Sequence, residues 1–311
     1  MIEARQISKR FGQRQVLCDL NFLVREGEIL GITGANGAGK STLFNILATL
    51  DKSFDGHVHI LGMDIRKNKQ QIREKIGYVP GRFSLYSDLT VEENLSFFAS
   101  AYGYPMSGVI ERCPKLWQSL EPFSGKQARY LSGGMKQKLA VCCALVHDPK
   151  LLLLDEPTTG IDPVSRYTLW QELKALQKTG TTILISTHYL EEAAIADRVL
   201  FIHEGKQLML DLPENILARY RKTLLSISGY PVQQLYRNLL DLPYSARTYI
   251  RGENLFVALP QGFSADLVAD FLRQKGLGSA IIELANPDME DVFIDQLVDY
   301  KREGSHENPR R

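Results

Sequence analysis

A short glycine-rich segment constrains the fold of this chain more than any other feature of its sequence. It fits the pattern G-x-x-x-x-G-K-[ST] and consists of Gly34-Ala35-Asn36-Gly37-Ala38-Gly39-Lys40-Ser41. An apolar run at 29–33 with the character of a buried strand precedes it, and residues 41–47 after it have helical character. Strand, glycine-rich loop and helix follow one another in this order where a loop binds phosphate. The segment therefore predicts a phosphate-binding loop at a strand–helix junction.

The residue types of this loop explain how it would hold a triphosphate. Glycines let backbone amides curl around phosphate oxygens, and the positive end of the following helix faces the anion. We expect Lys40 to reach the β- and γ-phosphates and the Ser41 hydroxyl to bind Mg²⁺. The alternative, a chance glycine-rich turn, does not explain the flanking strand and helix. The predicted nucleotide-binding residues of the loop are Gly34, Asn36, Gly37, Ala38, Gly39, Lys40, Ser41 and Thr42.

Two acidic residues, Asp155 and Glu156, directly follow the apolar run 151–154. Such an unbroken run is typical of a parallel strand that is buried on both faces. At the end of that strand, Asp155 is placed to hold Mg²⁺ through water. The carboxylate beside it, Glu156, can polarise the water that attacks the γ-phosphate. A solvated turn is the alternative interpretation of the pair, but it does not account for the preceding strand.

Further alternation of strands and helices indicates an α/β architecture with a parallel sheet. Residues 182–186 are the next apolar run, and the helix before it is predicted to begin with Asp162 as its cap, followed by proline. Gly180 is placed to end that helix. Residues 1–29 alternate apolar patches with polar turns, which predicts an antiparallel β layer, and residues 83–146 are mainly helical in pattern.

Composition and charge exclude several other classes of protein. Lys and Arg number 37 against 36 Asp and Glu, so the formal net charge of +1 gives no argument for a nucleic-acid partner. The cysteines have no zinc-binding spacing, and the adjacent Cys142 and Cys143 are interpreted as small buried thiols. The longest unbroken apolar stretch, 139–146, is far shorter than a bilayer span, and the N-terminus lacks a signal-peptide pattern. If this protein acts on a membrane, we expect it to do so through another subunit.

A third motif, LSGG followed by Q, resembles the signature of ABC transporter ATPases and comprises Leu131, Ser132, Gly133, Gly134 and Gln137. In that family, the serine and the glycine amides open a helix whose N-terminus faces a nucleotide bound to the other subunit. The physical basis is that exposed N–H donors and a helix dipole meet an anion. The resemblance implies ATP as the nucleotide and a dimer that encloses it. A simple helix cap at Ser132 would explain only part of the motif.

Three further matches follow the order of the family's motifs. Phe11 resembles the aromatic residue that stacks on adenine, with an ordinary sheet-packing residue as the alternative. Asp162, in a Gly-Ile-Asp sequence, resembles the D-loop aspartate that helps to align the opposing subunit's site. His188, in Ser-Thr-His, resembles the switch histidine that contacts the γ-phosphate and the attacking water. The resemblance implies Glu156 and His188 as catalytic residues, and Ser41 and Asp155 as metal ligands.

One position departs from the family's pattern. Gly81 follows the stretch 76–80, where the family usually has a glutamine that touches Mg²⁺ or water and couples the nucleotide to the membrane subunit. Because glycine has no side-chain oxygen, either Gln71 or another group substitutes, or the loop works through backbone movement. Active hydrolysis is still expected. The helical segment at 83–98 is expected to transmit the movement to a permease.

The resemblance covers residues 1–210, with a helical subdomain at about 83–150, and implies a P-loop NTPase of ABC type: a parallel-sheet core, an antiparallel β layer and that subdomain. A shift to shorter elements predicts a small α+β accessory domain at 211–300, and residues 301–311 are predicted to be a flexible tail. Residues 121–157 resemble bacterial multidrug exporter ATPases, and residues 286–293 resemble the E-D-x-F segment of drug- and polysaccharide-exporter ATPases of the daunorubicin-resistance type. An ordinary exposed helix start is the alternative.

Together these resemblances imply an ATP-binding and hydrolysing subunit of an ABC exporter that energises a separate integral-membrane permease. ATP and Mg²⁺ are the expected cofactors. The expected assembly is a homodimer or a heterodimer with another ABC ATPase, cytoplasmic and held at the inner face of the cell membrane by the permease, without nucleic acid. Two alternatives stay open: a soluble ABC ATPase of DNA repair or translation, and a regulatory module with a degenerate ATP site.

Overall fold

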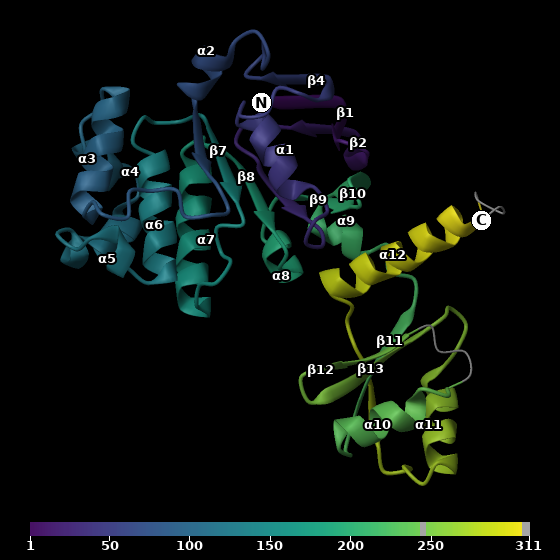
Figure 1. Ribbon diagram of the computed structural model, residues 1–311. Coiled ribbons are helices and arrows are strands. Elements are labelled where there is room, and N and C mark those ends of the chain that lie inside the picture. Colours follow the sequence, from purple (N-terminus) through teal and green to yellow (C-terminus); the bar gives the residue numbers. More distant parts are fainter. Residues whose placement is uncertain (243–246, 307–311) are drawn as a thin grey trace. The chain divides into compact units, whose positions relative to one another are not determined.

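The computed structural model describes residues 1–242 and 247–306. The chain divides into two compact units, Met1–Pro213 and Glu214–Arg311, each with its own hydrophobic core (Figure 1). The division falls after Pro213, close to the boundary expected after residue 210. No helix in the described part of the chain is long and apolar enough to cross a bilayer.

The central sheet of the first unit is built mainly from parallel strands. In order across the sheet they are β10 (Lys206–Asp211), β9 (Arg198–His203), β3 (Ile29–Thr33), β8 (Thr182–Thr187), β7 (Leu151–Asp155) and β6 (Ile76–Val79). The pairings from β9 to β6 are all parallel, and β10 joins the edge antiparallel. Every residue of β3, β7 and β8 is buried, as in strands covered on both faces. The interpretation of these three apolar runs as core strands is confirmed.

The register of the parallel strands brings their carboxyl ends to one edge of the sheet. Thr33 of β3 pairs with Thr187 of β8, and Asp155 of β7 pairs with Ser186. Open parallel sheets bind ligands outside the carboxyl ends of their strands. This edge therefore positions the loops after β3, β7 and β8, which carry the candidate residues.

A second sheet of the first unit is antiparallel. Its strands in order are β2 (Arg14–Val24), β1 (Ile2–Phe11), β4 (Asp55–Ile60) and β5 (Met63–Asp64). One core joins this sheet to the central sheet and to α1 (Lys40–Leu47), which buries Leu43, Phe44, Ile46 and Leu47 in it. The antiparallel layer expected from residues 1–29 is confirmed and includes two more strands. Because α1 is held from both sides, its N-terminus is fixed beside the end of β3.

Helices complete the first unit, and α3 to α6 lie together in a helical subdomain (Figure 1). The helices are α2 (Lys69–Arg73), α3 (Val91–Tyr102), α4 (Ser107–Arg112), α5 (Pro114–Leu120), α6 (Gly133–Ala144), α7 (Pro163–Lys178), α8 (Leu190–Ala193) and α9 (Pro213–Leu217), the last crossing the sequence boundary between the units. Short 3₁₀ turns occupy Glu121–Phe123 and Ala128–Tyr130. Cys142 and Cys143 are buried in the subdomain's core, which confirms their interpretation as buried thiols.

The first part of the segment expected to be helical at 83–98 is a loop. The helix begins only after Thr90, whose hydroxyl accepts a hydrogen bond from the Glu93 amide while the Glu93 carboxylate accepts one from the Thr90 amide. This reciprocal capping box satisfies two amides that a helix start leaves without partners. The apolar residues before Thr90 misled the prediction, because they pack as loop side chains such as Leu85 rather than as a helix face.

Both predicted ends of α7 are confirmed. The Asp162 carboxylate accepts a hydrogen bond from the Ser165 amide at 2.9 Å, and Pro163 occupies the first helical position, where no amide is needed. The pKa of Asp162 is lowered by this hydrogen bond from the Ser165 amide. At the other end, Gly180 has a φ of +98°, the left-handed conformation that follows many helices.

The second unit has the order βαββαβ followed by a long helix. Its elements are β11 (Thr223–Ser228), α10 (Val232–Leu239), β12 (Arg247–Arg251), β13 (Asn254–Leu259), α11 (Ala265–Gln274), β14 (Ile281–Leu284) and α12 (Met289–His306). The antiparallel sheet has the order β12-β13-β11-β14, which is the ferredoxin-like arrangement. The expected small α+β extension is thus a split βαβ fold.

Part of the tail predicted at 301–311 is helical. The helix α12 continues to His306, while residues 307–311 lie outside the described residues. A single glycine such as Gly304 costs a helix only about 1 kcal/mol, and the Lys, Arg and Glu residues before it are good helix formers.

The start of α12 contains a buried carboxylate, so its interpretation as an ordinary exposed helix start is wrong at Asp291. This side chain is fully buried and accepts hydrogen bonds from the Tyr249 hydroxyl and from Arg251, the latter at 3.1 Å. Arg247 lies 3.4 Å away as a second cation. Asp291 therefore joins α12 to β12.

Replacing Asp291 with asparagine is expected to destabilise the second unit by about 3 kcal/mol, because two arginines lose their buried counter-ion. Hydrogen exchange of peptides from β11 to β14 in the full-length protein measures this change. Glu290→Gln, at the exposed neighbouring position, is the matched control and should leave exchange unchanged. Equal protection in the two variants would contradict the assigned role of Asp291.

The direction in which the pKa of Asp291 is shifted determines whether the second unit gains or loses stability as the pH falls. Burial raises that pKa, but hydrogen bonds from Tyr249, the Asp288 amide and Arg251 outweigh burial, so the folded pKa lies below the unfolded value. Such a group stabilises the fold above its unfolded pKa, and its contribution is lost as the pH falls through the folded pKa. The unit should therefore lose stability below about pH 4. Urea unfolding between pH 3 and pH 6 tests this. In the Asp291→Asn variant, the free energy of unfolding should depend less on pH at the acidic end of this range.

Candidate functional site

The phosphate-binding loop (residues 34–41) curls around the ammonium group of its own lysine. Lys40 is buried and donates hydrogen bonds to the carbonyl oxygens of Gly34 at 2.8 Å and Ala35 at 3.3 Å. Gly39 has a φ of +106°, and a Cβ there would lie 2.6 Å from the Leu17 side chain and 2.8 Å from the Val16 carbonyl. Only glycine therefore fits this position, which leads directly into α1.

A cavity of about 300 Å³ lies beside this loop. Its lining residues are Phe11, Arg14, Val16, Gly37, Gly39, Lys40, Ser41, Thr42 and Glu156. The Phe11 ring is 54% exposed at the end of β1, so it does not pack inside the sheet, and the Lys9 ammonium lies 4.7 Å from its centre. The cavity thus offers an aromatic face, cationic side chains and the N-terminus of α1, the groups that suit a base and its phosphates.

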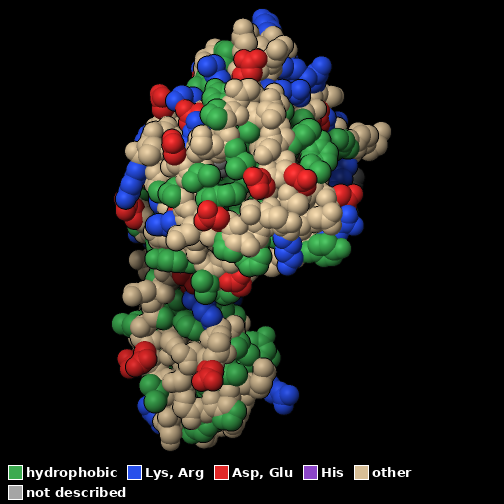
Figure 2. All heavy atoms as spheres, turned by 90° about the vertical axis from the view of Figure 1, so that its left-hand side faces the viewer, with side chains coloured by type: hydrophobic (Ala, Val, Ile, Leu, Met, Phe, Trp, Pro, Cys, Tyr) green, Lys and Arg blue, Asp and Glu red, His purple; other side chains and the backbone are tan. Residues whose placement is uncertain are grey.

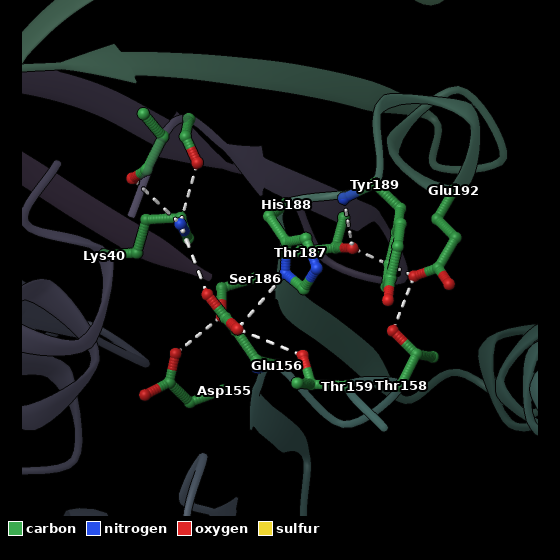
Figure 3. Close-up of polar contacts among 12 residues, drawn as sticks. Lys40, Asp155, Glu156, Thr158, Thr159, Ser186, Thr187, His188, Tyr189 and Glu192 are labelled. Carbon is green, nitrogen blue, oxygen red and sulfur yellow. Dashed lines mark hydrogen bonds and ion pairs between the residues drawn. The ribbon is translucent and has the colours of Figure 1, made fainter. Parts of the chain in front are cut away.

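Asp155, the last residue of β7, and Glu156 after it are fixed by the neighbouring strand β8 (Figure 3). The Ser186 hydroxyl donates to Asp155 Oδ1 at 2.6 Å and accepts the Glu156 amide at 2.8 Å. Asp155 is buried, whereas the Glu156 side chain reaches the cavity. Ser186 therefore holds one carboxylate directly and the other through its backbone.

Glu156 has an unusual backbone conformation for a residue with a side chain. Its φ is +48°, in the left-handed region that side chains other than those of Asn and Asp adopt at a cost of roughly 1 kcal/mol. The hydrogen bond from its amide to Ser186 stabilises this turn. The turn directs the carboxylate toward Lys40, so the strain has a functional consequence.

The Glu156 carboxylate lies between a lysine and a histidine (Figure 3). Its Oε1 is 3.3 Å from the Lys40 ammonium, and its Oε2 is 3.3 Å from His188 Nδ1 and accepts the Thr159 hydroxyl at 3.0 Å. Burial raises the pKa of Glu156, but the charge of Lys40 and hydrogen bonds from Thr159 and Lys40 hold that pKa below its ordinary value. Glu156 is therefore ionised at neutral pH and can accept a proton or orient a water molecule.

The signature segment and the loop before α7 are packed together. Ser132 caps α6, because its hydroxyl accepts the Met135 amide at 3.3 Å. A Cβ on Gly133 would lie 3.2 Å from the Gly160 carbonyl, and one on Gly134 would lie 3.1 Å from the Ser165 hydroxyl. Both glycines thus allow the N-terminus of α6 to approach that of α7.

The predicted site residues form two groups within one chain. Phe11, Lys40, Ser41, Thr42 and Glu156 meet at the cavity, with Asp155 and His188 beside Glu156. Leu131 is buried and Gln137 is half-buried on α6, and neither they nor Ser132, Gly133, Gly134 and Asp162 line the cavity of their own chain. Among the loop residues, Asn36 is exposed and Ala38 is buried, and both lie outside that lining.

Gly81 lies against the first of the two acidic residues. A Cβ at this position would be 3.2 Å from the Asp155 carbonyl oxygen and 3.4 Å from its Oδ2. Gln71, which was considered as a substitute for the missing glutamine, is exposed on α2 and does not line the cavity. A side chain at position 81 would therefore be crowded against Asp155, which glycine avoids.

Sequence reasoning missed several residues that shape the site. Ser186 and Thr159 bind the two carboxylates, and Arg14 and Val16 of β2 line the cavity. A hydroxyl residue at the end of a core strand was a usable signal for Ser186. No local pattern marks Arg14 and Val16, because only the fold of β2 brings them to the loop.

The chemistry of the donor set fits Mg²⁺ that is held together with a nucleotide. Ser41 supplies a hydroxyl in the cavity and Asp155 a carboxylate whose Oδ1 is oriented by Ser186. Among the described residues, no three His, Cys, Asp or Glu side chains are grouped so as to hold a metal by themselves. This pattern suits Mg²⁺, which is usually bound by one or two protein oxygens together with substrate phosphates.

Known proteins resemble this chain in sequence over most of its length. Residues 17–159 match the family model for ABC transporters. The chain is 33% identical over 302 residues to Nod factor export ATP-binding protein I of Sinorhizobium fredii, covering 94% of this chain and 84% of that protein. It is 36% identical over 221 residues to the probable multidrug ABC transporter ATP-binding protein YbhF of Escherichia coli, covering 70% of this chain but only 38% of that longer protein.

Solved structures resemble the first unit. An ATP-binding subunit of an ABC transporter has a TM-score of 0.64 and 31% identity, covering 70% of this chain and 92% of that one. A dimeric ATP-binding cassette in a post-hydrolysis state with ADP and Pi has a TM-score of 0.62 and 30% identity, covering 68% and 98%. Since a relative matches nearly the whole chain and the solved cassettes share its fold, this chain belongs to the ABC transporter family.

Proposed function

We propose that this chain is the ATP-binding and hydrolysing subunit of an ABC exporter and that it energises a separate membrane permease. The observation that carries the proposal is the meeting of Lys40, Glu156 and His188 beside the cavity. The names of the relatives, one a multidrug transporter protein and one a Nod factor export protein, support export as the direction. The chain would act at the inner face of the cell membrane, held there by the permease.

Binding of ATP begins with an exchange of partners at Lys40. Its ammonium contacts Glu156 at 3.3 Å, and the β- and γ-phosphates compete with that carboxylate for it. Once the phosphates take the ammonium, Glu156 loses its nearest cation and gains an anionic neighbour. Both changes raise the pKa of Glu156 and make it a stronger base. The pairing thus keeps Glu156 a weak base until a triphosphate arrives.

Hydrolysis then needs a water molecule in line with the γ-phosphate. Glu156 accepts its proton or orients it, while His188 and Thr159 fix the carboxylate by hydrogen bonds. Mg²⁺ held by Ser41 and Asp155 would neutralise phosphate charge. The adenine is proposed to stack on Phe11, which is exposed at the mouth of the cavity.

A second ATPase subunit is proposed to complete each site. Ser132 and the amides of Gly133 and Gly134 open α6 but lie outside the cavity of their own chain. A helix N-terminus suits the γ-phosphate of a nucleotide on another subunit. Asp162, at the N-terminus of the adjacent α7, would align the same interface. The partner is a second copy or another ABC ATPase.

The permease is proposed to dock on a groove of the first unit. This cavity of about 300 Å³ is lined by residues that include Leu50, Tyr78, Leu85, Phe98, Tyr102 and His147. Next to it, the exposed rings of Tyr86 and Phe97 meet edge to face, with centres 4.7 Å apart. Hydrophobic side chains gather in patches on the face that carries α3 (Figure 2). Exposed aromatic clusters of this kind mark binding surfaces.

Neither alternative function has an observation in its favour. A soluble ABC ATPase of DNA repair or translation would typically have a coiled-coil insertion or two motor halves, and the described residues contain neither. A regulatory module would have a degenerate site, whereas Lys40, Glu156 and His188 are in contact. The departure at Gly81 changes the loop after β6 but leaves this contact in place.

Glu156→Gln is expected to slow ATP hydrolysis by on the order of 100-fold, because the amide cannot accept a proton. With ATP and Mg²⁺ the variant should accumulate as a dimer. Phosphate release and light scattering after gel filtration measure the two effects, with the exposed Glu191→Gln as the control. Equal turnover by wild type and Glu156→Gln would refute the enzymatic mechanism. A variant that stays monomeric at every concentration and also pairs with no other ABC ATPase subunit would refute the shared site.

Replacing both Tyr86 and Phe97 with alanine is expected to abolish co-purification with the permease and substrate-stimulated ATPase activity. Basal ATPase activity should stay within about twofold of wild type, because neither ring lines the nucleotide cavity. Leu267→Ala is the matched control, since this residue is 44% exposed and Phe97 is 45% exposed. Retained permease binding by the double variant would show that the docking surface lies elsewhere.

A further inference from the structure

A buried carboxylate next to the site has no role in the reaction described so far. Glu192 lies on α8, its side chain is only 3% exposed, and it does not line the nucleotide cavity. A buried carboxylate is costly unless it is paired and hydrogen-bonded. Its partners therefore indicate what it does.

The partners of Glu192 come from three separate segments, and Figure 3 shows the two that are threonines, Thr158 and Thr187. Its Oε2 accepts the Thr158 hydroxyl at 2.7 Å and the Thr187 hydroxyl at 3.0 Å. Its Oε1 pairs with the Arg166 guanidinium at 3.0 Å. In the sequence, Thr158 follows Glu156 closely, Thr187 is the last residue of β8, and Arg166 lies near the start of α7. One carboxylate thus joins the segments next to the proposed catalytic residues and Asp162.

Two of these contacts continue to His188. The Thr187 hydroxyl accepts the Tyr189 amide at 3.0 Å, which fixes the backbone on both sides of His188. The Arg166 guanidinium lies 4.0 Å from the centre of the Tyr189 ring, and that ring lies 4.0 Å from the His188 ring. His188 in turn lies 3.3 Å from the Glu156 carboxylate. Glu192 thus reaches Glu156 through the backbone and side chains around His188.

We propose that Glu192 is a positioning residue for ATP hydrolysis, which holds His188 and the loop of Glu156 in register with each other and with the start of α7. The inference rests on the ATPase reaction proposed above. Glutamine at this position keeps one acceptor oxygen. If that oxygen takes the place of Oε2 and accepts both hydroxyls, the amide NH₂ takes the place of Oε1 and faces the Arg166 guanidinium, donor against donor. His188 then loses its fixed orientation toward Glu156, although the nucleotide cavity keeps all of its lining residues.

Glu192→Gln is expected to lower kcat between roughly 10-fold and 100-fold, the range for small misplacement of a reacting group, with KM for ATP unchanged. The matched control is Glu172→Gln, because Glu172 is also 3% exposed but pairs only at 4.0 Å with Lys115, away from the site. A lower kcat for Glu192→Gln with an unchanged kcat for Glu172→Gln supports the proposal. An unchanged kcat for Glu192→Gln overturns it, provided that wild type hydrolyses ATP. Absent hydrolysis by wild type instead refutes the proposed function.

A double-mutant cycle with His188→Ala separates positioning from a merely structural role. If Glu192 acts through His188, Glu192→Gln should change the single-turnover rate by less than about twofold in the His188→Ala background. Independent effects that multiply would overturn the proposal. If Glu192→Gln does not fold, Thr158→Val removes one of the same hydrogen bonds and is expected to lower kcat in the same direction. Glu192→Asp should restore part of the rate, because it keeps the charge.

Discussion

The parallel register of β3, β7 and β8 determines where the rest of the site can lie. Because Asp155 is opposite Ser186, one hydroxyl can donate to the Asp155 carboxylate and accept the Glu156 amide. That pair of bonds supports the left-handed turn at Glu156, which directs its carboxylate to Lys40. A shift of one residue between β7 and β8 would place the neighbouring side chain opposite Asp155 and remove both bonds. The catalytic geometry is therefore a consequence of sheet pairing as much as of the motifs.

Charge balance within the site follows from the same geometry. Lys40 is buried and shared between two carbonyl oxygens and one carboxylate, and no resident anion is needed to satisfy it. The Lys40 ammonium is therefore held in position by these groups. It remains available to bind a triphosphate, because a triphosphate carries more negative charge than one carboxylate. The strand β6 and the loop after it supply lining residues to the groove proposed for the permease, and Gly81 in this loop lies close to Asp155. A side chain at position 81 would be crowded against Asp155, so the glycine leaves this carboxylate accessible from the loop after β6.

Features set by neighbouring residues could be predicted from the sequence. The phosphate-binding loop, the three core strands, and both ends of α7 depend on local patterns and cap chemistry, and the structure has them where the sequence indicated. The start of α3 was misplaced because the capping box at Thr90 was not recognised among apolar loop residues. Thr159 and Glu192 could not be assigned, because Thr159 acts within a turn and Glu192 bonds to a residue 34 positions away, and only the fold creates these contacts.

Three buried carboxylates show how differently the fold uses the same group. Burial raises the pKa of Glu172, and Lys115 at 4.0 Å only partly opposes this. Asp291 has two arginines and a tyrosine hydroxyl, and its pKa is lowered. Glu192 has one arginine and two hydroxyls that belong to three different segments. A buried carboxylate that is paired fixes both the direction and the distance of the groups that bind it. It can therefore position as many segments of the chain as supply those groups. By this criterion Asp291 fixes one helix to one strand, whereas Glu192 acts on the loops that meet at the phosphate site.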